Sequence, residues 1–529
     1  MRLVARLVSA GAACGLVGAC LAAGPAHAAA QECAPTWAGG GGDWHTVGGT
    51  TRNTNYQPAE TAIGVGNVGQ LTQRWASPTG IFAGQSTPTV AGGCVYFQGA
   101  GLLNAVDART GDQVWQADND PGCPADFSLY CPFGATVVDG RVHVDGSGGG
   151  QPFGAAYDAR TGARLWKSKP VYFGYKAAQL SSPKVAHGLH VTFTTGPDFD
   201  PSSRPGYAFL DEQTGATVLS RTTNPGESDY LGGGIWSTAA VDASGYLYVG
   251  TSNPEEAGTD AEYDNSILKI DVKQGRSTFG SVLGNYKGDK DYFEGGAFDA
   301  DFGAGPTLFP GPNGRPMLVE MQKSGTFHAL YADTMQLAWK RTVGVSNLAT
   351  RLDGNSAMAA YDGERLYVTA NPGILYAIEP ATGETIWMAP TALEFYTPYR
   401  PVVAANGVLF TMRLNNSRLA AWHADTGELL AEFTPTGRDG AGCDAGPSGG
   451  LSIAHHLVVV NCGGFVAAYG LPVSPPPPAA TPNQPAAPTA PGRAYRPPLA
   501  STGPVAPLAL LGVAALVLAA ALRGRTSVR

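Results

Sequence analysis

The stretch Leu103-Asn104-Ala105-Val106-Asp107-Ala108-Arg109-Thr110-Gly111, with Trp115 four positions on, decides the fold. Its alternating apolar residues predict a half-buried β-strand, and its Asp, Thr and Gly residues predict a turn. The residues that lead to Trp115 predict the returning strand. The stretch therefore predicts a β-hairpin whose second strand carries a large aromatic side chain.

The same hairpin pattern recurs along the chain. Its eight copies begin near Leu103, Ala155, Phe209, Leu268, Ala329, Tyr376, Ala420 and Phe465, and the last one stops where its turn would begin. A second hairpin precedes most copies, as in residues 137–144 and 240–249. Two hairpins at a spacing of about 45 to 60 residues fit four-stranded propeller blades. We therefore expect an all-β, eight-bladed β-propeller, with the tryptophan of each copy packed between blades.

The N-terminal sequence predicts a secretory signal peptide over residues 1–28. Arg2 and Arg6 precede an apolar run, and Ala26-His27-Ala28 forms an A-x-A cleavage site. An alternative interpretation takes Cys20 as the lipidated residue of a lipoprotein box. Both interpretations place the propeller, which we expect over residues 29–470, outside the cytoplasm.

The C-terminus contains two further segments. Residues 471–498 are rich in proline and alanine and predict an extended wall spacer. Residues 499–529 hold Leu499-Ala500-Ser501-Thr502-Gly503, an apolar run and a basic tail. This order resembles the L-A-x-T-G sortase signals of Gram-positive, actinobacterial-type cells. The resemblance implies cleavage between Thr502 and Gly503 and linkage to peptidoglycan. The alternative is a transmembrane helix as a plain membrane anchor.

Composition excludes some partners and predicts disulfides. With 14% charged residues, a net charge of −8 and no basic cluster in the expected propeller, nucleic acid is not an expected partner. Six cysteines follow the signal peptide, and an exported chain is expected to oxidise them. They allow fifteen connectivities. The favoured pairs are Cys123 with Cys131, Cys443 with Cys462, and Cys33 with Cys94.

The motif A-x-D-x-x-T-G-x-x-x-W resembles the pyrroloquinoline quinone (PQQ) repeat. The segment with Trp44, Gly48-Gly49 and Asn53-Thr54 is similar to the start of quinoprotein alcohol dehydrogenases. A repeat alone does not imply an enzyme, because bacterial outer-membrane assembly scaffolds use the same repeat without a cofactor. The evidence for a cofactor must come from residues outside the repeat.

Two segments resemble the family's quinone and metal elements. Gly232-Gly233-Gly234-Ile235-Trp236 is similar to the segment whose tryptophan stacks under the quinone, a planar group that needs an aromatic face. Tyr248-Val249-Gly250-Thr251-Ser252-Asn253-Pro254 looks like the element whose asparagine ligates the metal. An amide oxygen suits a hard cation such as Ca²⁺. The resemblance therefore implies that Trp236 binds PQQ and Asn253 binds the metal.

A third segment, Phe298-Asp299-Ala300-Asp301-Phe302-Gly303-Ala304, is closest to the form found in polyvinyl-alcohol dehydrogenases. By position, Asp299 matches the catalytic base and lies among the metal ligands. Asp301 matches the extra acidic ligand present where a lanthanide replaces Ca²⁺. Without the family resemblance, the sequence predicts only that both carboxylates lie in a turn or face solvent.

Lys323 matches the cation that the family places against the quinone oxygens, where it stabilises the reduced cofactor. The family's metal-ligating glutamate has no clear counterpart, and Asp198 is the best substitute. The vicinal cysteine pair of methanol and ethanol dehydrogenases is absent, and so is the C-x-x-C-H motif for haem c. Electrons would leave through an external acceptor.

The resemblance as a whole predicts a surface-anchored, PQQ-dependent dehydrogenase with one metal ion, Ca²⁺ or a lanthanide, that oxidises an alcohol by hydride transfer to the quinone. Secondary and polymeric alcohols are the expected substrates. The alternative is a non-catalytic propeller that binds protein or glycan at the cell wall.

Overall fold

The computed structural model describes residues 33, 40–79, 86–99, 101–119, 134–147, 151–171, 179–196, 205–224, 232–253, 261–289, 301–345, 355–391, 401–413, 417–443 and 450–472. All of them belong to one compact unit, Met1–Pro472. The expected signal peptide, spacer and sorting signal lie outside the described residues. Within the described part, helix occurs only as short turns such as η1 (Val68–Gln70) and η4 (Pro312–Gly314), none long and apolar enough to cross a membrane.

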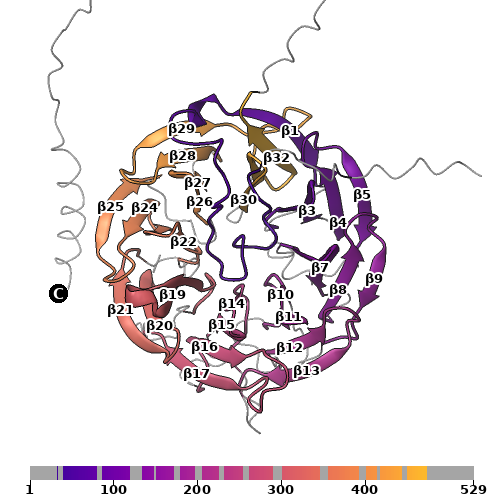
Figure 1. The fold of residues 1–529 in the computed structure, drawn as a ribbon, viewed down its shortest axis with the longest axis vertical. Helices are drawn as coiled ribbons and strands as arrows, with labels where there is room; N and C mark the ends of the chain where they lie inside the picture. The colour runs from indigo at the N-terminus through magenta and orange to yellow at the C-terminus, as the bar shows by residue number, and fades with distance from the viewer. Residues whose placement is uncertain are drawn as a thin grey trace, which may run out of the picture. The chain divides into compact units, whose positions relative to one another are not determined.

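The strands form eight four-stranded antiparallel sheets arranged in a ring (Figure 1). The predicted eight-bladed propeller is therefore confirmed. We number the blades 1 to 8 in chain order. Blades 1 to 4 consist of β2 (Thr89–Ala91), β3 (Cys94–Gly99), β4 (Leu102–Asp107), β5 (Gln113–Asp118); β6 (Thr136–Val138), β7 (Arg141–Gly146), β8 (Phe153–Asp158), β9 (Arg164–Lys167); β10 (Lys184–Ala186), β11 (Leu189–Phe193), β12 (Gly206–Asp211), β13 (Thr217–Thr222); and β14 (Ala240–Val241), β15 (Tyr246–Gly250), β16 (Ser266–Asp271), β17 (Val282–Lys287). Blades 5 to 7 consist of β18 (Thr307–Pro310), β19 (Pro316–Met321), β20 (Thr326–Tyr331), β21 (Gln336–Thr342); β22 (Ala360–Tyr361), β23 (Leu366–Ala370), β24 (Ile374–Ile378), β25 (Thr385–Pro390); and β26 (Val403–Ala405), β27 (Val408–Met412), β28 (Leu419–His423), β29 (Leu429–Phe433).

Blade 8 joins the two ends of the ring. It contains β30 (Leu451–Ala454), β31 (Leu457–Asn461) and β32 (Phe465–Gly470), and its fourth strand is β1 (Thr72–Pro78). β1 pairs with β32 from Thr72 opposite Gly470 to Pro78 opposite Phe465. The eighth copy of the repeat stops after its first strand because the N-terminal part of the chain supplies the second.

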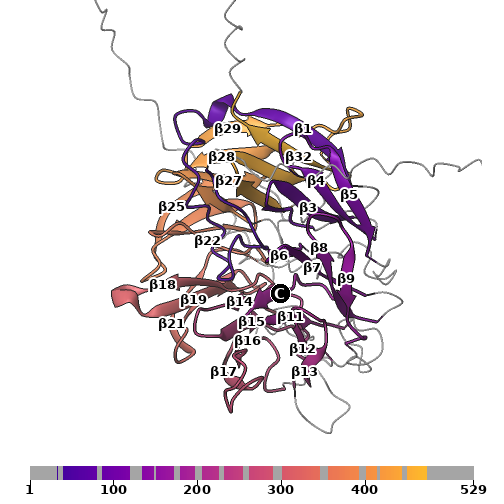
Figure 2. The ribbon, with the colours of Figure 1, turned by 45° about the vertical axis from the view of Figure 1, so that its right-hand side comes forward.

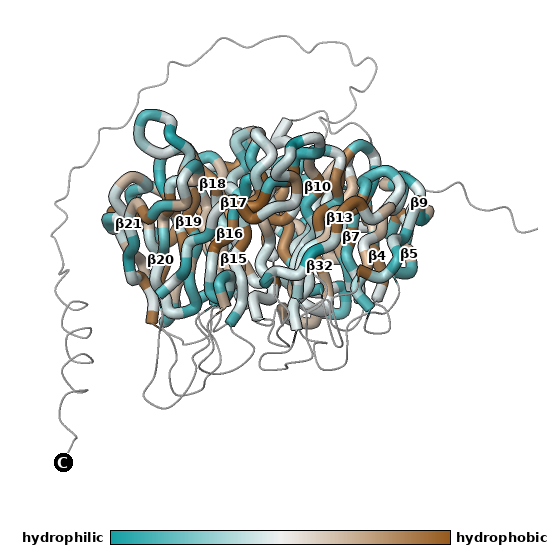
Figure 3. Tube along the Cα trace, turned by 90° about the horizontal axis from the view of Figure 1, so that it is seen from below, coloured by the Kyte–Doolittle hydropathy of each residue, from teal (hydrophilic) through white to brown (hydrophobic). Residues whose placement is uncertain are grey.

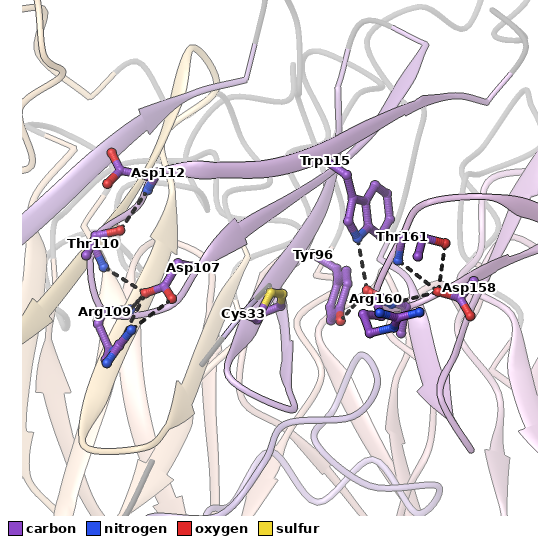
Figure 4. The surroundings of a disulfide bond; sticks show 12 residues. Cys33, Tyr96, Asp107, Arg109, Thr110, Asp112, Trp115, Asp158, Arg160 and Thr161 are labelled. Carbon is purple, nitrogen blue, oxygen red and sulfur yellow. Dashed lines mark hydrogen bonds and ion pairs between the residues drawn. A yellow bond between two sulfur atoms is a disulfide. The ribbon is translucent and has the colours of Figure 1, made fainter. Parts of the chain in front are cut away.

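The repeat motif builds the contact between neighbouring blades. The Asp107 carboxylate accepts the backbone N–H groups of Arg109 and Thr110, which closes the turn (Figure 4). Trp115 stacks on Gly162 of the next blade's turn, where an added Cβ would lie 2.6 Å from the indole, and its Nε1–H donates to Ala159 O at 2.9 Å. The equivalent pairs are Trp75 with Gly111, Trp166 with Gly215, Trp339 with Gly383, and Trp387 with Gly427. The predicted packing role of these tryptophans is confirmed.

Residues 44–57, which we call the central segment, run through the middle of the ring (Figures 1 and 2). The segment makes hydrogen bonds to the innermost strand of every blade. Its partners are Val90 on β2, Val137 on β6, Lys184 on β10, Val241 on β14, Leu308 on β18, Tyr361 on β22, Ala404 on β26 and Ile453 on β30. The central segment therefore fills the space that eight inner strands leave between them.

Two side chains fix the central segment. Asn53, buried and with φ of 57°, donates from Nδ2 to the carbonyls of Thr238, Ala239 and Pro306 at 3.0 to 3.1 Å. Lys184 is fully buried, and its Nζ donates to Val47 O at 2.7 Å. Burial lowers the pKa of Lys184 from 10.5 to about 7.

The core is distributed among the blades. Apolar stretches lie within the strands, while many turns are hydrophilic (Figure 3). Two disulfides join distant segments: Cys33–Cys94 links the chain before the central segment to β3, and Cys443–Cys462 links the residues on either side of β30 and β31 (Figure 4 shows Cys33). These two predicted pairs are confirmed. Cys123 and Cys131 lie outside the described residues.

Candidate active site

Four predicted site residues come from equivalent places on blades 4 and 5. Trp236 and Asp301 lie in the segments that enter the innermost strands β14 and β18, and Asn253 and Lys323 follow the second strands β15 and β19. In an antiparallel blade, the start of the first strand and the end of the second lie at the same edge. The fold therefore gathers all four residues at one face of two neighbouring blades.

Asp301 binds both Trp236 and Lys323. Its Oδ2 accepts the indole Nε1–H of Trp236 at 2.8 Å, and its Oδ1 lies 2.9 Å from Lys323 Nζ. The ammonium group of Lys323 also lies 4.7 Å from the centre of the Trp236 ring. The Asp301 side chain is 1% exposed and that of Lys323 is 10% exposed, so water screens this ion pair little.

Gly303 gives Trp236 the room that it needs. A Cβ added to Gly303 would lie 1.8 Å from the indole six-membered ring, closer than any real contact. The backbone of the D-x-D-x-G segment therefore packs directly on the tryptophan, while the Trp236 side chain remains partly exposed. Residues from two blades thus hold the indole in one orientation.

Asn253 is buried and lies on the segment beside Trp236. The backbone N–H of Gly233 donates to Asn253 O at 3.4 Å, and that of Ser252 donates to Gly234 O at 2.6 Å. The neighbouring Thr251 carbonyl accepts the Phe302 N–H at 3.2 Å. The strand extension that carries Asn253 therefore lies between the Trp236 segment and the Asp301 segment.

Two predicted site residues, Asp299 and Asp198, lie outside the described residues. Across the described part of the chain, no group of three or more His, Cys, Asp or Glu side chains could hold a metal ion. Asn253 and Asp301 are oxygen donors of the kind that Ca²⁺ and lanthanides prefer. Two such residues are too few to hold the ion, so a metal site here would need further ligands such as Asp299 or Asp198.

Glu320 on β19 is a buried carboxyl group near the site that no sequence motif indicated. Its Oε1 accepts the Gly305 N–H at 3.0 Å, and Oε2 has no hydrogen-bond partner among the described residues. Burial, reinforced by the Asp301 charge, raises the pKa of Glu320 to about 8. This pKa favours the protonated form of Glu320 near neutral pH.

This arrangement fits a planar anionic cofactor such as PQQ. Trp236 offers an aromatic ring whose orientation is fixed from one side, and Lys323 holds a cation over it. A flat quinone gains from stacking on an indole, and its oxygens gain from a neighbouring ammonium group. The residues of the site thus supply an aromatic face and a neighbouring cation of the kind that the cofactor needs.

The chain is similar in sequence to known proteins. The chain matches the family model described as outer membrane protein assembly factor BamB over residues 72–196 and 206–462. A polyvinylalcohol dehydrogenase from a Pseudomonas species is 24% identical over 491 residues, which cover 79% of this chain and 73% of that protein. The quinohemoprotein alcohol dehydrogenase ADH-IIG from Pseudomonas putida is 26% identical over 375 residues, covering 62% of this chain and 51% of that protein.

The fold also matches solved structures. The quinohemoprotein alcohol dehydrogenase from Comamonas testosteroni has a TM-score of 0.65 at 18% identity, covering 82% of each chain. At that identity the likeness concerns the fold alone. By length, this chain spans about three-quarters of the Pseudomonas polyvinylalcohol dehydrogenase and about half of the P. putida relative.

Proposed function

Since this chain belongs to the propeller family described as outer membrane protein assembly factor BamB, a fold shared by scaffolds and enzymes, we propose that it is a quinoprotein alcohol dehydrogenase. The observation that carries the proposal is the contact of Asp301 with both Trp236 and Lys323. These contacts fix an aromatic face and a cation side by side, as the binding of a planar cofactor with quinone oxygens would require. The named dehydrogenases among its relatives support the same function.

Each site residue then has a role. Trp236 stacks on PQQ, and Lys323 binds its quinone oxygens. Asn253 and Asp301, together with Asp299 and Asp198, hold one Ca²⁺ or lanthanide ion. When bound, PQQ accepts the hydride that the alcohol carbon loses. Asp299, which matches the family's catalytic base by position, would take the proton of the alcohol hydroxyl.

The proposed substrates are secondary or polymeric alcohols, which the similarity to polyvinylalcohol dehydrogenases supports. The sequence contains no C-x-x-C-H motif, so it does not bind a haem c covalently through that motif. The electrons therefore pass to a separate acceptor.

The test is a titration of the purified protein with PQQ, without metal and with Ca²⁺ or La³⁺, followed by tryptophan fluorescence and cofactor absorbance. We expect saturable one-to-one binding that requires the metal, and then oxidation of secondary alcohols with an artificial electron acceptor. Absence of binding with either metal would contradict the enzyme and favour the second candidate, a propeller that binds protein or glycan at the cell wall. The family description is the observation that favours this second candidate.

We also propose that the propeller is exported and anchored at the surface of a Gram-positive cell. Leu499, Ala500, Thr502 and Gly503 support attachment by sortase, as does the apolar run that follows them. Mass spectrometry of protein released from the wall should find Thr502 as the last residue, joined to a peptidoglycan fragment. Recovery of the intact Arg529 terminus from membranes would mean a membrane anchor instead.

A further inference from the structure

Asn224 is a buried amide that joins two segments of the candidate site. It lies just after β13, the outer strand of blade 3, and is 6% exposed. Its Nδ2–H groups donate to Gly232 O at 2.8 Å and to Asp264 Oδ1 at 2.9 Å, and its Oδ1 accepts the Tyr263 N–H at 2.9 Å. Both donors and the acceptor of the amide are therefore used. Because the side chain makes all three bonds, its removal would break all three.

Asp264 is the second member of this pair. It is fully buried, and its Oδ2 accepts the Ala261 N–H at 2.9 Å while its Oδ1 accepts from Asn224. A buried carboxylate needs such donors, because a buried charge without hydrogen bonds is costly. Asn224 and Asp264 thus tie the exit of blade 3 to the residues that lead into β16 of blade 4.

Two of the glycines that precede Trp236 lie directly against this pair. A Cβ on Gly232 would lie 2.4 Å from Asp264 Oδ1, and one on Gly233 would lie 2.9 Å from Asn224 Nδ2. Gly233 also has φ of 81°, a conformation that side chains disfavour. The main chain can approach the pair this closely because both residues are glycines.

Both segments that Asn224 binds lead to the candidate metal ligand Asn253. On one side, the Gly233 N–H donates to Asn253 O at 3.4 Å. On the other side, the Tyr263 carbonyl accepts the Thr251 hydroxyl at 2.5 Å, two residues before Asn253. Asn224 therefore links the two sides through its own side chain.

The first of these segments also leads to Trp236, three residues after Gly233. Main-chain hydrogen bonds hold residues 234–235, and they would persist in any variant of Asn224. The Asn224 side chain instead fixes where the segment begins, at Gly232. Its loss should therefore shift the segment without unfolding it.

We propose that Asn224, paired with Asp264, is a positioning residue that places Asn253 and Trp236 relative to each other. This role rests on the proposed function, which gives the two residues a metal ion and a cofactor to bind. Asn224 acts through the segments that it joins and not by contact with either ligand. Its loss should weaken the binding of metal and PQQ while every ligand residue stays in the chain.

Asn119 offers a matched control. It follows β5, the outer strand of blade 1, and is also 6% exposed. Its amide donates to Gln98 Oε1 at 2.7 Å and to Asp145 O at 3.5 Å, and accepts from the Tyr157 hydroxyl at 3.2 Å. Asn119→Ala and Asn224→Ala should therefore lower the urea midpoint to a similar extent, although Asn119 holds blades 1 and 2 and not the candidate site.

The first test is hydrogen–deuterium exchange on the metal-free and cofactor-free protein. Asn224→Ala should speed exchange in peptides covering residues 232–236 and 261–265, because the Tyr263 N–H loses its acceptor and Gly232 O its donor. Asn224→Asp keeps that acceptor but turns an oxygen toward Gly232 O and Asp264 Oδ1, so it should affect residues 232–236 more than residues 261–265. Asn119→Ala should leave both peptides at the wild-type rate.

The second test measures the La³⁺ concentration that gives half-maximal PQQ binding, followed by fluorescence. This concentration should rise about 10- to 100-fold in Asn224→Ala, the effect typical of losing a residue that orients metal ligands. Asn224→Asp should raise it as well, whereas Asn119→Ala should not change it. The control separates positioning from stability, since both alanine variants lose a buried amide with three hydrogen bonds.

The positioning role is wrong if Asn224→Ala needs no more La³⁺ than Asn119→Ala. If Asn224→Ala does not fold, the same comparison with Asn224→Asp decides. Failure of the wild-type protein to bind PQQ with either metal would instead overturn the proposed function, and with it the role of Asn224. Normal binding by the wild type together with normal binding by the Asn224 variants would overturn the role alone.

Discussion

The indole nitrogen of Trp236 donates a hydrogen bond to Asp301 Oδ2 at 2.8 Å, across the boundary between blades 4 and 5. The aromatic ring of one blade is thus oriented by a carboxylate of the next, which also binds Lys323. Stacking, charge and metal binding at the proposed site therefore depend on each other. Substitutions can separate their contributions to PQQ binding.

Replacing Trp236 with alanine should weaken PQQ binding at least tenfold, about 1.4 kcal/mol, because the flat face for the quinone is lost. Trp236→Phe keeps a flat ring but loses the N–H that Asp301 accepts, so its PQQ affinity should fall between those of wild type and Trp236→Ala. Fluorescence titration with PQQ at saturating Ca²⁺ measures the affinity of each variant. Equal affinity of Trp236→Ala and wild type would mean that the quinone does not stack on this ring.

Asp301→Asn should abolish the effect of metal on PQQ affinity while leaving weak, metal-independent binding through Trp236 and Lys323. The amide keeps an oxygen that can accept the indole N–H, but it removes the negative charge that Asp301 would add to the binding of a divalent or trivalent cation. The matched control is Asp333→Asn, which removes an exposed carboxylate paired with Arg315. PQQ titrations with and without La³⁺ should distinguish the two variants.

The stability of the protein should rise with pH between about 7 and 10.5 because of Lys184. Its pKa is about 7 in the folded protein and 10.5 in the unfolded chain, so the unfolded chain binds more protons in this window. The free energy of unfolding then increases by at most about 1.4 kcal/mol per pH unit. Lys184→Met should remove this increase. Urea unfolding of both proteins at pH 6.5, 8 and 9.5 gives the comparison, and parallel pH profiles would contradict the assignment.

Asn53→Ala should destabilise the propeller by about 3 kcal/mol, because three buried carbonyls on blades 4 and 5 lose their donor. Asn67→Ala, which removes only local bonds to Ala62 O and Gly64 N–H, should cost about 1 kcal/mol. Urea midpoints measure the difference. Similar losses for the two variants would mean that the central segment contributes little to stability.

The repeat could be predicted from the sequence because most copies carry their own turn, and four of them carry a tryptophan at the same spacing: Trp115, Trp166, Trp339 and Trp387. The source of the last strand could not be read in the same way, since β1 precedes the repeats and contains Trp75 without the Asp–Thr–Gly turn. The route of residues 44–57 through the ring could not be predicted from the sequence either, because their hydrogen-bond partners are single residues on eight different strands.

At the site, the resemblance identified Trp236, Asn253, Asp301 and Lys323, which the structure places at one face of blades 4 and 5. It gave no signal for Glu320. This residue is a buried carboxyl group whose hydrogen-bond partner, the Gly305 N–H, is a backbone group that no motif indicates.

The pairing of β1 with β32 also constrains when this protein can fold. Residues about 400 positions apart must meet before the last blade exists, so the chain cannot complete its ring until β32 has been synthesised. Contacts of such long sequence separation form slowly. The ring therefore stays open until its final strand is available, which would suit the export that we propose.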